Sequence, residues 1–480
     1  MRGRPAFVLS MLMHQLDPIL RRNARLGDWQ VISPSQATGH VEVVESFRAI
    51  QGRRFDRPTV VVADQVNGDE EPPEGVRAVI TSRTVDLVSH VAVRARNASL
   101  LFATCYDPVC FDNLKAMKGR VLRLTVTPAG DVSFAEAAEP QPRAAPTAPR
   151  SPARIARPSP SVRPTRRQDF DPSRVGAKSS NLKTLADKMP DWILVPRSVA
   201  LPFSAFDAVL RAEVNRSVAE RYHALLNAID ASPSQTLAEV RRCLSELHLP
   251  ESLKTELGQA IQAEGLPWPE DWAAAARCVK QVWASKWNDR AYFSRQSRGL
   301  PHAAIFMAVL IQEVVEADYA FVIHTANPFT RDRAELYAEV VLGLGETLVG
   351  NYPGRALSFV SPKANPKPTV LSYPGKSLGL YGGGLIFRSD SNGEDLADYA
   401  GAGLYDSVLL RPPREQTLNY CDDPLVWNEN FRTEFLTAVT RIGLVVEQAF
   451  GRAQDIEGAC AKGRFAVVQT RPQVGLGNLE

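Results

Sequence analysis

A serine, a histidine and an arginine near residue 90 are spaced so that the histidine could accept a phosphoryl group and the other two could stabilise it. Ser89 precedes a run of helix-compatible residues, so it is a candidate N-cap, and His90 would lie in the first helical turn, where the dipole favours negative charge. Arg94 would share the face of His90 and could hold phosphate oxygens. A neutral histidine ring nitrogen is nucleophilic near neutral pH. A capping or core histidine beside solvated arginines is the alternative.

Two carboxylates and an amide near residue 460 have the spacing of a magnesium site. Asp455 and Glu457 are two residues apart in a strand-like run, so their side chains would project from one face of a sheet. The next strand-like run would place Gln469 beside them. Oxygen ligands on one wall suit Mg²⁺ while it bridges nucleotide phosphates. A solvent-facing hairpin is the alternative.

Two cations are candidates for phosphate contacts. Lys178 follows Gly176 at the start of a predicted helix, where backbone N–H groups and one cation could face phosphates, although the spacing is not that of a Walker loop. Arg388 lies near the end of a predicted strand, before a polar loop with glycines, and offers a bidentate cation for a triphosphate. A polar surface loop is the alternative for any one of these loop residues.

The region between these motifs changes from helical to strand-like periodicity. The stretch before residue 300 is helical and includes Arg290, which could face nucleotide or form a structural ion pair. The runs 307–315 and 319–325 are predicted to be adjacent strands. Further along this block, Glu339 and Glu346 are candidate acids behind the primary ligands.

The histidine motif is expected in a small α/β domain over residues 55–135, preceded by an N-terminal segment. Residues 1–54 are expected to form a helix at about 8–24 and then irregular or strand structure. About 80 residues suffice for an independent domain. The predicted strands that surround the histidine helix are 59–63, 78–80, 101–104 and 121–124.

A proline-rich segment separates this domain from the rest of the chain. Residues 136–168 contain eight prolines among alanine, serine and arginine, so we expect a stiffened linker without a packed core. At about 3.1 Å per residue, some 30 residues could span on the order of 90 Å. That reach suits a carrier domain that must visit two places. Residues 169–480 are expected to form the second domain.

Composition excludes several classes of protein. The 480 residues suffice for two or three domains, and 44% hydrophobic and 23% charged residues are ordinary for a globular protein. A net charge of +3 argues against a nucleic-acid binder, and no apolar run is long enough for a membrane span. Six scattered cysteines without zinc spacing indicate reduced thiols in an intracellular compartment.

The motifs resemble those of the α-glucan, water dikinases, which phosphorylate starch and are related to the pyruvate, phosphate dikinases and phosphoenolpyruvate synthases. The resemblance lies in Ser89–Asn97 with Leu101–Cys105, in Gly-x-Lys-x-x-Asn-Leu at 176–182, and in the run 386–395, which matches the glucan dikinase pattern nearly letter for letter. It implies a small swivelling phosphohistidine domain followed by an ATP-grasp-like nucleotide-binding domain, an α/β and α+β multidomain fold. The site residues that it implies are His90 as phosphoryl carrier, Lys178 and Arg388 as phosphate contacts, and Asp455, Glu457 and Gln469 as nucleotide and metal contacts.

The reaction implied by the resemblance uses ATP, with Mg²⁺ as cofactor. The β-phosphate passes to His90 and then to a glucosyl hydroxyl of an α-glucan, and the γ-phosphate passes to water, which leaves AMP and orthophosphate. A phosphoglucan, water dikinase and a catalytically silent nucleotide-binding scaffold are the alternatives. We expect neither a starch-binding domain nor a barrel after the nucleotide domain, and the chain could be a fragment. A homodimer stays open, as does a plastid or cytoplasmic location without a clear targeting segment.

Overall fold

The computed structural model describes most of the chain in a series of ranges. These are residues 27–67, 70–83, 85, 89–127, 130–139, 158–230, 232–268, 271–297, 299–350, 352, 354–394 and 403–473, with Leu16, Ile19 and Asn23. The helix expected at about 8–24 lies outside these ranges, apart from the single residues Leu16, Ile19 and Asn23. Within the described residues, no helix has both the length and the apolar character needed to cross a membrane.

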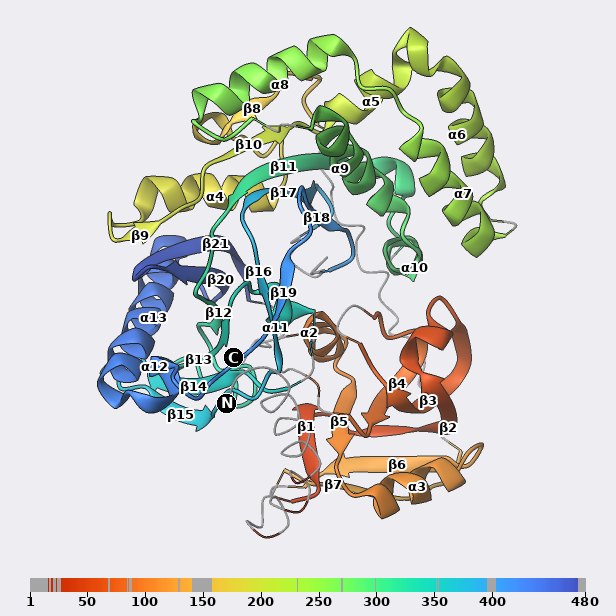
Figure 1. Cartoon of the computed structure of the whole chain (residues 1–480). Coiled ribbons are helices and arrows are strands. Elements are labelled where there is room, and N and C mark those ends of the chain that lie inside the picture. Colours follow the sequence, from red (N-terminus) through yellow and green to blue (C-terminus); the bar gives the residue numbers. More distant parts are fainter. Residues whose placement is uncertain are drawn as a thin grey trace.

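The small domain is built on a seven-stranded sheet whose central strands are parallel (Figure 1). The order is β1-β5-β4-β3-β2-β6-β7. The strands are β1 (Trp29–Ser33), β2 (Ala37–Ser46), β3 (Arg54–Gln65), β4 (Glu74–Thr81), β5 (Leu101–Cys105), β6 (Val121–Val126) and β7 (Val132–Glu136). Because β1 and β2 belong to this sheet, the boundary predicted at residue 55 falls inside the domain and must move toward residue 28.

Both faces of this sheet are buried by helices. Val60 and Val62 of β3 pack in the same core as residues of α3 (Pro108–Ala116), whereas Val61 and Ala63 share the opposite core with residues of α2 (His90–Asn97). Alternating side chains of a strand point to opposite faces, so a strand that is apolar throughout requires such a cover on both sides. The expected small α/β domain is therefore confirmed.

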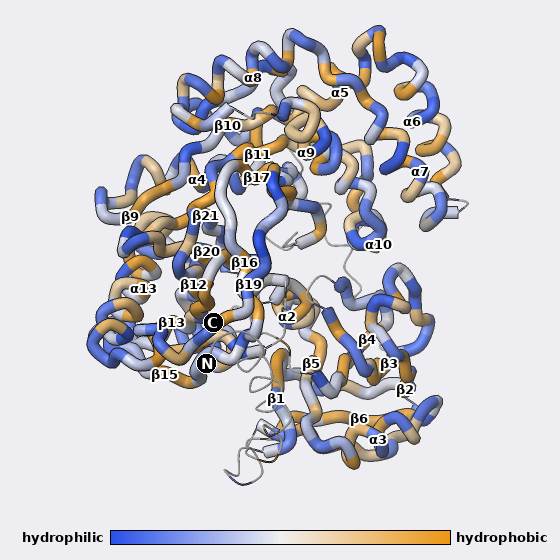
Figure 2. The backbone as a smooth tube through the Cα atoms, viewed as in Figure 1, coloured by the Kyte–Doolittle hydropathy of each residue, from blue (hydrophilic) through white to orange (hydrophobic). Residues whose placement is uncertain are grey.

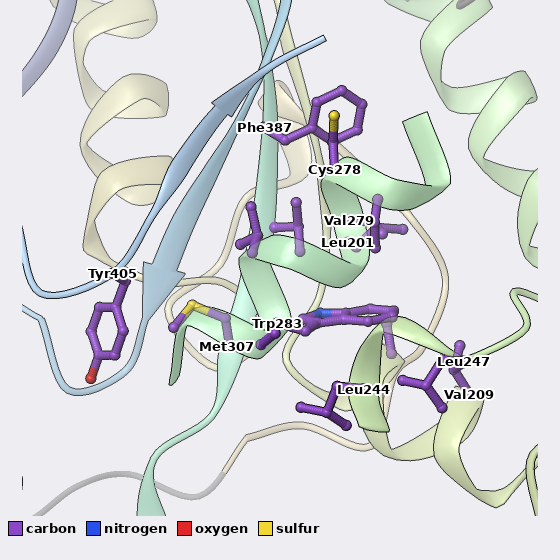
Figure 3. Packing of buried hydrophobic residues seen from close by; sticks show 14 of the residues in the cluster. Leu201, Val209, Leu244, Leu247, Cys278, Val279, Trp283, Met307, Phe387 and Tyr405 are labelled. Carbon is purple, nitrogen blue, oxygen red and sulfur yellow. The ribbon is translucent and has the colours of Figure 1, made fainter. Parts of the chain in front are cut away.

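The first half of the second domain is an antiparallel sheet covered by helices. Its strand order is β18-β17-β11-β10-β8. The strands are β8 (Thr165–Arg166), β10 (Ser198–Leu201), β11 (Met307–Val314), β17 (Gly384–Ser391) and β18 (Ser407–Leu409), and the helices are α5 (Ser204–Arg211), α6 (Arg216–Ala228), α7 (Pro233–Ser245), α8 (Glu251–Ala263), α9 (Trp272–Ala284) and α10 (Asp289–Ser297). Trp283 of α9 packs in one buried cluster with Leu201 and Phe387 of the sheet (Figure 3).

The second half is another antiparallel-rich sheet, with the order β15-β14-β13-β12-β20-β21-β9. The strands are β9 (Ile193–Leu194), β12 (Tyr319–His324), β13 (Glu335–Leu342), β14 (Leu357–Pro362), β15 (Thr369–Ser372), β20 (Gln454–Ala461) and β21 (Arg464–Pro472). Residues of α4 (Ala177–Lys188) and α13 (Glu429–Phe450) bury one face. A two-stranded sheet of β16 (Leu378–Tyr381) and β19 (Arg414–Thr417) and the short helices α11 (Glu346–Val349) and α12 (Pro424–Trp427) complete this half.

The strands predicted at 307–315 and 319–325 exist as β11 and β12, but the prediction that they are adjacent is wrong. β11 pairs with β10 and β17, whereas β12 pairs with β13 and β20 in the other sheet. Figure 2 shows that apolar residues are frequent along both strands. An apolar run predicts a buried strand, but it carries no information about which strand pairs with it.

The proline-rich segment is shorter than predicted at both ends. Glu136 belongs to β7, and Thr165–Arg166 form β8, which pairs with β10. Ser159, which lies upstream of β8, is also bound to this domain, because its carbonyl accepts a hydrogen bond from the hydroxyl of Ser204 at 2.6 Å. The second domain therefore begins before the predicted residue 169, and residues 140–157 lie outside the described ranges.

Candidate functional site

A cavity of about 790 Å³ lies between the two sheets of the second domain. Its volume is in the range of small-molecule and cofactor sites. Part of its lining is apolar, with Val314, Ala320, Val322, Leu344 and Leu380. Six of the candidate residues from the sequence also line it, namely Lys178, Arg290, Glu346, Arg388, Glu457 and Gln469. A cavity with one apolar part and several charged groups suits a ligand that itself has an apolar part and a charged part.

Side chains of four neighbouring strands form two rows across one face of the second sheet. Directly opposite residues of antiparallel strands point to the same side. The first row runs across β13, β12, β20 and β21 through Tyr337, His324, Asp455 and Arg471. The second row is displaced by two residues along each of these strands and runs through Glu339, Val322, Glu457 and Gln469. The predicted placement of Gln469 beside Glu457 is therefore confirmed, while metal binding by these residues stays a prediction.

Arg388 reaches the second row from the other sheet. Its neighbour Phe387 points into the helical core, so alternation along β17 directs Arg388 to the cavity face. Its Nη2 lies 3.4 Å from Glu457 Oε2 and donates a short hydrogen bond to Gln469 Oε1. Its buried Nε has no hydrogen-bond partner among the described atoms. The guanidinium thus has donor capacity beyond its present contacts, as a phosphate-binding arginine requires.

Lys178 lies on the same wall, at the start of α4. Its Nζ is 2.5 Å from Glu394 Oε2 and donates to the carbonyl of Ser389 at 2.7 Å. The ammonium therefore lies beside the strand that carries Arg388. Glu394 was not predicted to act in the site, although it belongs to the quoted motif at 386–395.

The expectation that backbone N–H groups at the start of α4 face phosphates is wrong. The buried carboxylate of Asp390 accepts hydrogen bonds from the amides of Gly176 at 2.9 Å, Lys178 at 3.0 Å and Ser179 at 3.2 Å. A Cβ at Gly176 would lie 2.3 Å from Asp390 Oδ1, so only glycine permits this approach. Burial raises the pKa of Asp390, and its hydrogen bonds and the charge of Lys178 oppose the rise. The helix terminus is thus satisfied by protein.

Asp455 is held by two neighbours in its own row. His324 Nδ1 lies 2.5 Å from Asp455 Oδ1, and Arg471 Nε lies 3.4 Å from Asp455 Oδ2. Burial alone would raise the pKa of Asp455, but the nearby His324, Arg471 and Arg96 favour the carboxylate and hold the pKa below its ordinary value. Neither His324 nor Arg471 was predicted, because their role depends on strand pairing and not on local sequence.

The residues present fit a magnesium ion only in part. The described residues contain no group of three or more histidine, cysteine or acidic side chains that could hold a metal. Glu457 and Gln469 offer two oxygen ligands at the cavity, and nucleotide phosphates would have to provide others. Asp455 would first have to leave His324 and Arg471. We therefore place Glu457 and Gln469 ahead of Asp455 as candidate ligands.

Arg290 and Glu339 have structural partners. Arg290 Nη2 lies 2.7 Å from Asp406 Oδ1, and its Nε donates to the carbonyl of Leu404 at 3.0 Å, so the ion-pair alternative is present even though Arg290 lines the cavity. Glu346 also lines the cavity. Glu339 accepts a hydrogen bond from the hydroxyl of Tyr337 at 2.6 Å.

In the small domain, α2 begins at His90 as predicted. Ser89 is its N-cap, and its hydroxyl accepts a hydrogen bond from the amide of Ala92 at 3.4 Å. The side chain of His90 lies outside the described part of the structure.

Arg94 does not match its expected role. Its side chain is 4% exposed, and it contacts the carbonyl of Glu70 at 2.7 Å and the carboxylate of Glu71 at 3.2 Å. We therefore correct the expectation that Arg94 holds phosphate, because its guanidinium is directed at protein acceptors inside its own domain.

Comparisons with known proteins agree with this architecture. Residues 28–143 match the family described as α-glucan water dikinase, phosphohistidine-like domain. Residues 268–356 match the family described as pyruvate phosphate dikinase, AMP/ATP-binding domain. The chain thus joins a phosphohistidine-like domain to a dikinase-type nucleotide-binding domain.

Over nearly its whole length the chain is a homologue of the α-glucan water dikinases, which confirms the resemblance read from the motifs. It is 44% identical to the chloroplastic α-glucan water dikinase of Solanum tuberosum, over 98% of this chain and 33% of that protein. It is 42% identical to α-glucan water dikinase 2 of Arabidopsis thaliana, over 98% of this chain and 38% of that protein. A phosphoenolpyruvate synthase of Pyrococcus furiosus is 26% identical over 40% of this chain and 21% of its own length. The chain spans about a third of the length of the curated glucan dikinases it matches.

Proposed function

We propose that this chain carries out the phosphoryl-transfer steps of an α-glucan, water dikinase. ATP binds in the cavity between the two sheets. A ring nitrogen of His90 takes the β-phosphoryl group, water takes the γ-phosphoryl group, and AMP and orthophosphate leave. The phosphohistidine then transfers its phosphoryl group to a glucosyl hydroxyl of an α-glucan, and His90 returns to its neutral form. The printed names of the relatives support the glucan as acceptor.

Within this proposal the cavity residues align the triphosphate and balance its charge, which is how proteins catalyse phosphoryl transfer. Lys178 and Arg388 hold phosphate oxygens, while the apolar lining receives the base. Glu457 and Gln469 would hold Mg²⁺, which when bound neutralises charge on the phosphates. The observation that carries the proposal is the meeting of Arg388 with Glu457 and Gln469 in one cavity of a dikinase-type domain.

Isotope labelling tests the proposal directly. The protein is incubated with ATP labelled at the β- or the γ-phosphate, with and without soluble α-glucan. We expect acid-labile, base-stable label on the protein from β-labelled ATP only, no label in a His90→Ala variant, and loss of the label to glucan in a chase. If the intact protein binds ATP but takes up no label, the silent nucleotide-binding scaffold replaces the dikinase.

The same assay separates the two kinds of glucan dikinase. Transfer to plain glucan supports the α-glucan, water dikinase, whereas transfer that requires prephosphorylated glucan supports the phosphoglucan, water dikinase. A plastid or cytoplasmic location and a homodimer are further parts of the proposal. Cell fractionation and light scattering test them.

A further inference from the structure

The small domain contacts both halves of the nucleotide domain. On one side, the guanidinium of Arg96 in α2 lies over the ring of Phe329, 5.8 Å from its centroid, in the segment between β12 and β13. On the other side, a Cβ at Gly52 would lie 2.5 Å from the ring of Phe293 in α10. In the view of Figure 1, α10 lies above the small domain. The small domain therefore contacts the segment between β12 and β13 in one half and α10 in the other.

Arg96 also interacts electrostatically with residues of the first and second rows of the cavity sheet, namely Asp455, Tyr337 and Glu339. Its Nη1 donates to the carbonyl of Ile32 at 3.3 Å, which fixes the side chain to its own domain. Burial lowers the pKa of Arg96 to about 10, and the charges of Asp455, Tyr337 and Glu339 oppose that change. Seating the small domain would remove water from these groups, and burying a carboxylate costs free energy even where it has a partner. A cation supplied by the small domain offsets that cost.

We propose that Arg96 is a positioning residue that seats the small domain, with the start of α2 at His90, against the nucleotide domain, and that Gly52 forms the second contact, with α10. The link to catalysis rests on the proposed function, because seating would serve the transfer from nucleotide to His90. Transfer from His90 to glucan would not require this contact. Arg96 should thus affect the first half-reaction and spare the second.

The first test measures seating without using activity. Cysteines are introduced by Gly52→Cys with Phe293→Cys and joined by a short bismaleimide, and the linked peptides are identified by mass spectrometry because native Cys421 is exposed. Removing one buried cation–aromatic contact should lower the linked fraction about fivefold or more in Arg96→Ala. Arg96→Lys should restore part of it. Phe329→Ala should lower it as well, without a change in the small domain.

A matched pair of glycines tests the contact between Gly52 and α10. Gly52 and Gly119 both have left-handed backbones, with φ of +74° and +81°, but nothing lies within 4 Å of a Cβ at Gly119. Gly52→Ala should therefore slow labelling of His90, whereas Gly119→Ala should not, and Gly52→Ala with Phe293→Ala should recover the rate. Equal labelling rates in both glycine variants would show that the contact between Gly52 and Phe293 does not seat the small domain.

The two half-reactions separate this inference from the proposed function. We expect Arg96→Ala to slow labelling from β-labelled ATP at least fivefold and to leave transfer from prelabelled protein to glucan unchanged. Unchanged linkage and unchanged labelling in Arg96→Ala would overturn the inference. If the intact protein takes up no label but Arg96→Ala still lowers linkage, the proposed function fails and the seating contact stands.

Discussion

Arg388 of β17 and Gln469 of β21 are hydrogen-bonded across the cavity, although their strands belong to different sheets. The same guanidinium lies 3.4 Å from the carboxylate of Glu457. One side chain therefore joins the two halves of the nucleotide domain. In the proposed function, phosphate oxygens of a nucleotide in the cavity would replace Glu457 and Gln469 as acceptors for this guanidinium.

Substitution of Arg388 by lysine should weaken nucleotide binding. A lysine keeps the charge but loses the planar fork that contacts two acceptors at once. Loss of one hydrogen bond to a charged group costs about 1.5–3 kcal/mol, which corresponds to roughly 10- to 150-fold in Kd. Titration calorimetry with a non-hydrolysable ATP analogue measures the change. Arg197→Lys, in an ion pair with Glu313 at 2.6 Å and far more exposed, is the control and should bind as the intact protein does.

Glu457→Gln should raise the magnesium concentration needed for tight nucleotide binding. The substitution keeps the shape of the side chain and removes the charge that a hard cation requires. We expect at least the roughly tenfold loss in metal affinity seen when a residue that supports a metal site is removed. Asp455→Asn should have a smaller effect, because that carboxylate is held by His324 and Arg471. Magnesium titrations at fixed ATP rank the two acids, and a larger effect at Asp455 would reverse our order of ligands.

Asp390→Ala should destabilise the nucleotide domain. The variant loses a helix cap, worth about 0.5–2 kcal/mol, and leaves buried backbone donors without acceptors, at about 1–3 kcal/mol for each unsatisfied group. We therefore expect a loss of about 2 kcal/mol or more in urea unfolding. The control is Asp271→Ala, which removes the exposed cap that accepts from the amide of Ala274 at 2.9 Å. Equal losses in the two variants would show that burial of Asp390 adds nothing.

The stability of the protein should depend on His302 at mildly acidic pH. Burial, followed by the charges of Arg295 and Lys286, lowers the pKa of His302 from 6.5 to about 4, and His302 Nδ1 accepts a hydrogen bond from Arg295 Nε at 3.0 Å. Between these two values the unfolded chain binds more protons at this site, so its contribution favours folding less as pH falls from about 6.5 to about 4.

His302→Asn keeps an acceptor near the Nδ1 position and removes the titrating group. Thermal unfolding at pH 7, 5.5 and 4.5 should therefore show a smaller loss of stability in the variant than in the intact protein. Parallel curves for the two proteins would mean that the pKa of His302 is the same in the folded and unfolded chains.

Local sequence was sufficient where the chemistry depends on neighbours in the chain. The N-cap at Ser89 follows from the residue type before a helix, and the alignment of Glu457 with Gln469 follows from strand periodicity and a short turn. The amphipathic patterns also gave the helices before residue 300.

Contacts between distant parts of the chain could not be predicted in this way. Asp390 caps a helix more than two hundred residues away, and Asp455 meets His324 because β20 pairs with β12. For the same reason the start of the small domain was placed too late. β1 joins the sheet by pairing with β5, and nothing in its own sequence indicates that partner.

The two-residue strand β8 has a consequence for how the carrier is attached. Among the described strands it pairs with β10 alone, at the outer edge of the sheet that contains Arg388, whereas Glu457 belongs to the other sheet. The tether thus has its root on one wall of the cavity. Under the proposed function, if the cavity walls separate to release AMP, the small domain would stay connected to the sheet of Arg388 and move away from the sheet of Glu457, so its movement toward a glucan would have a fixed direction.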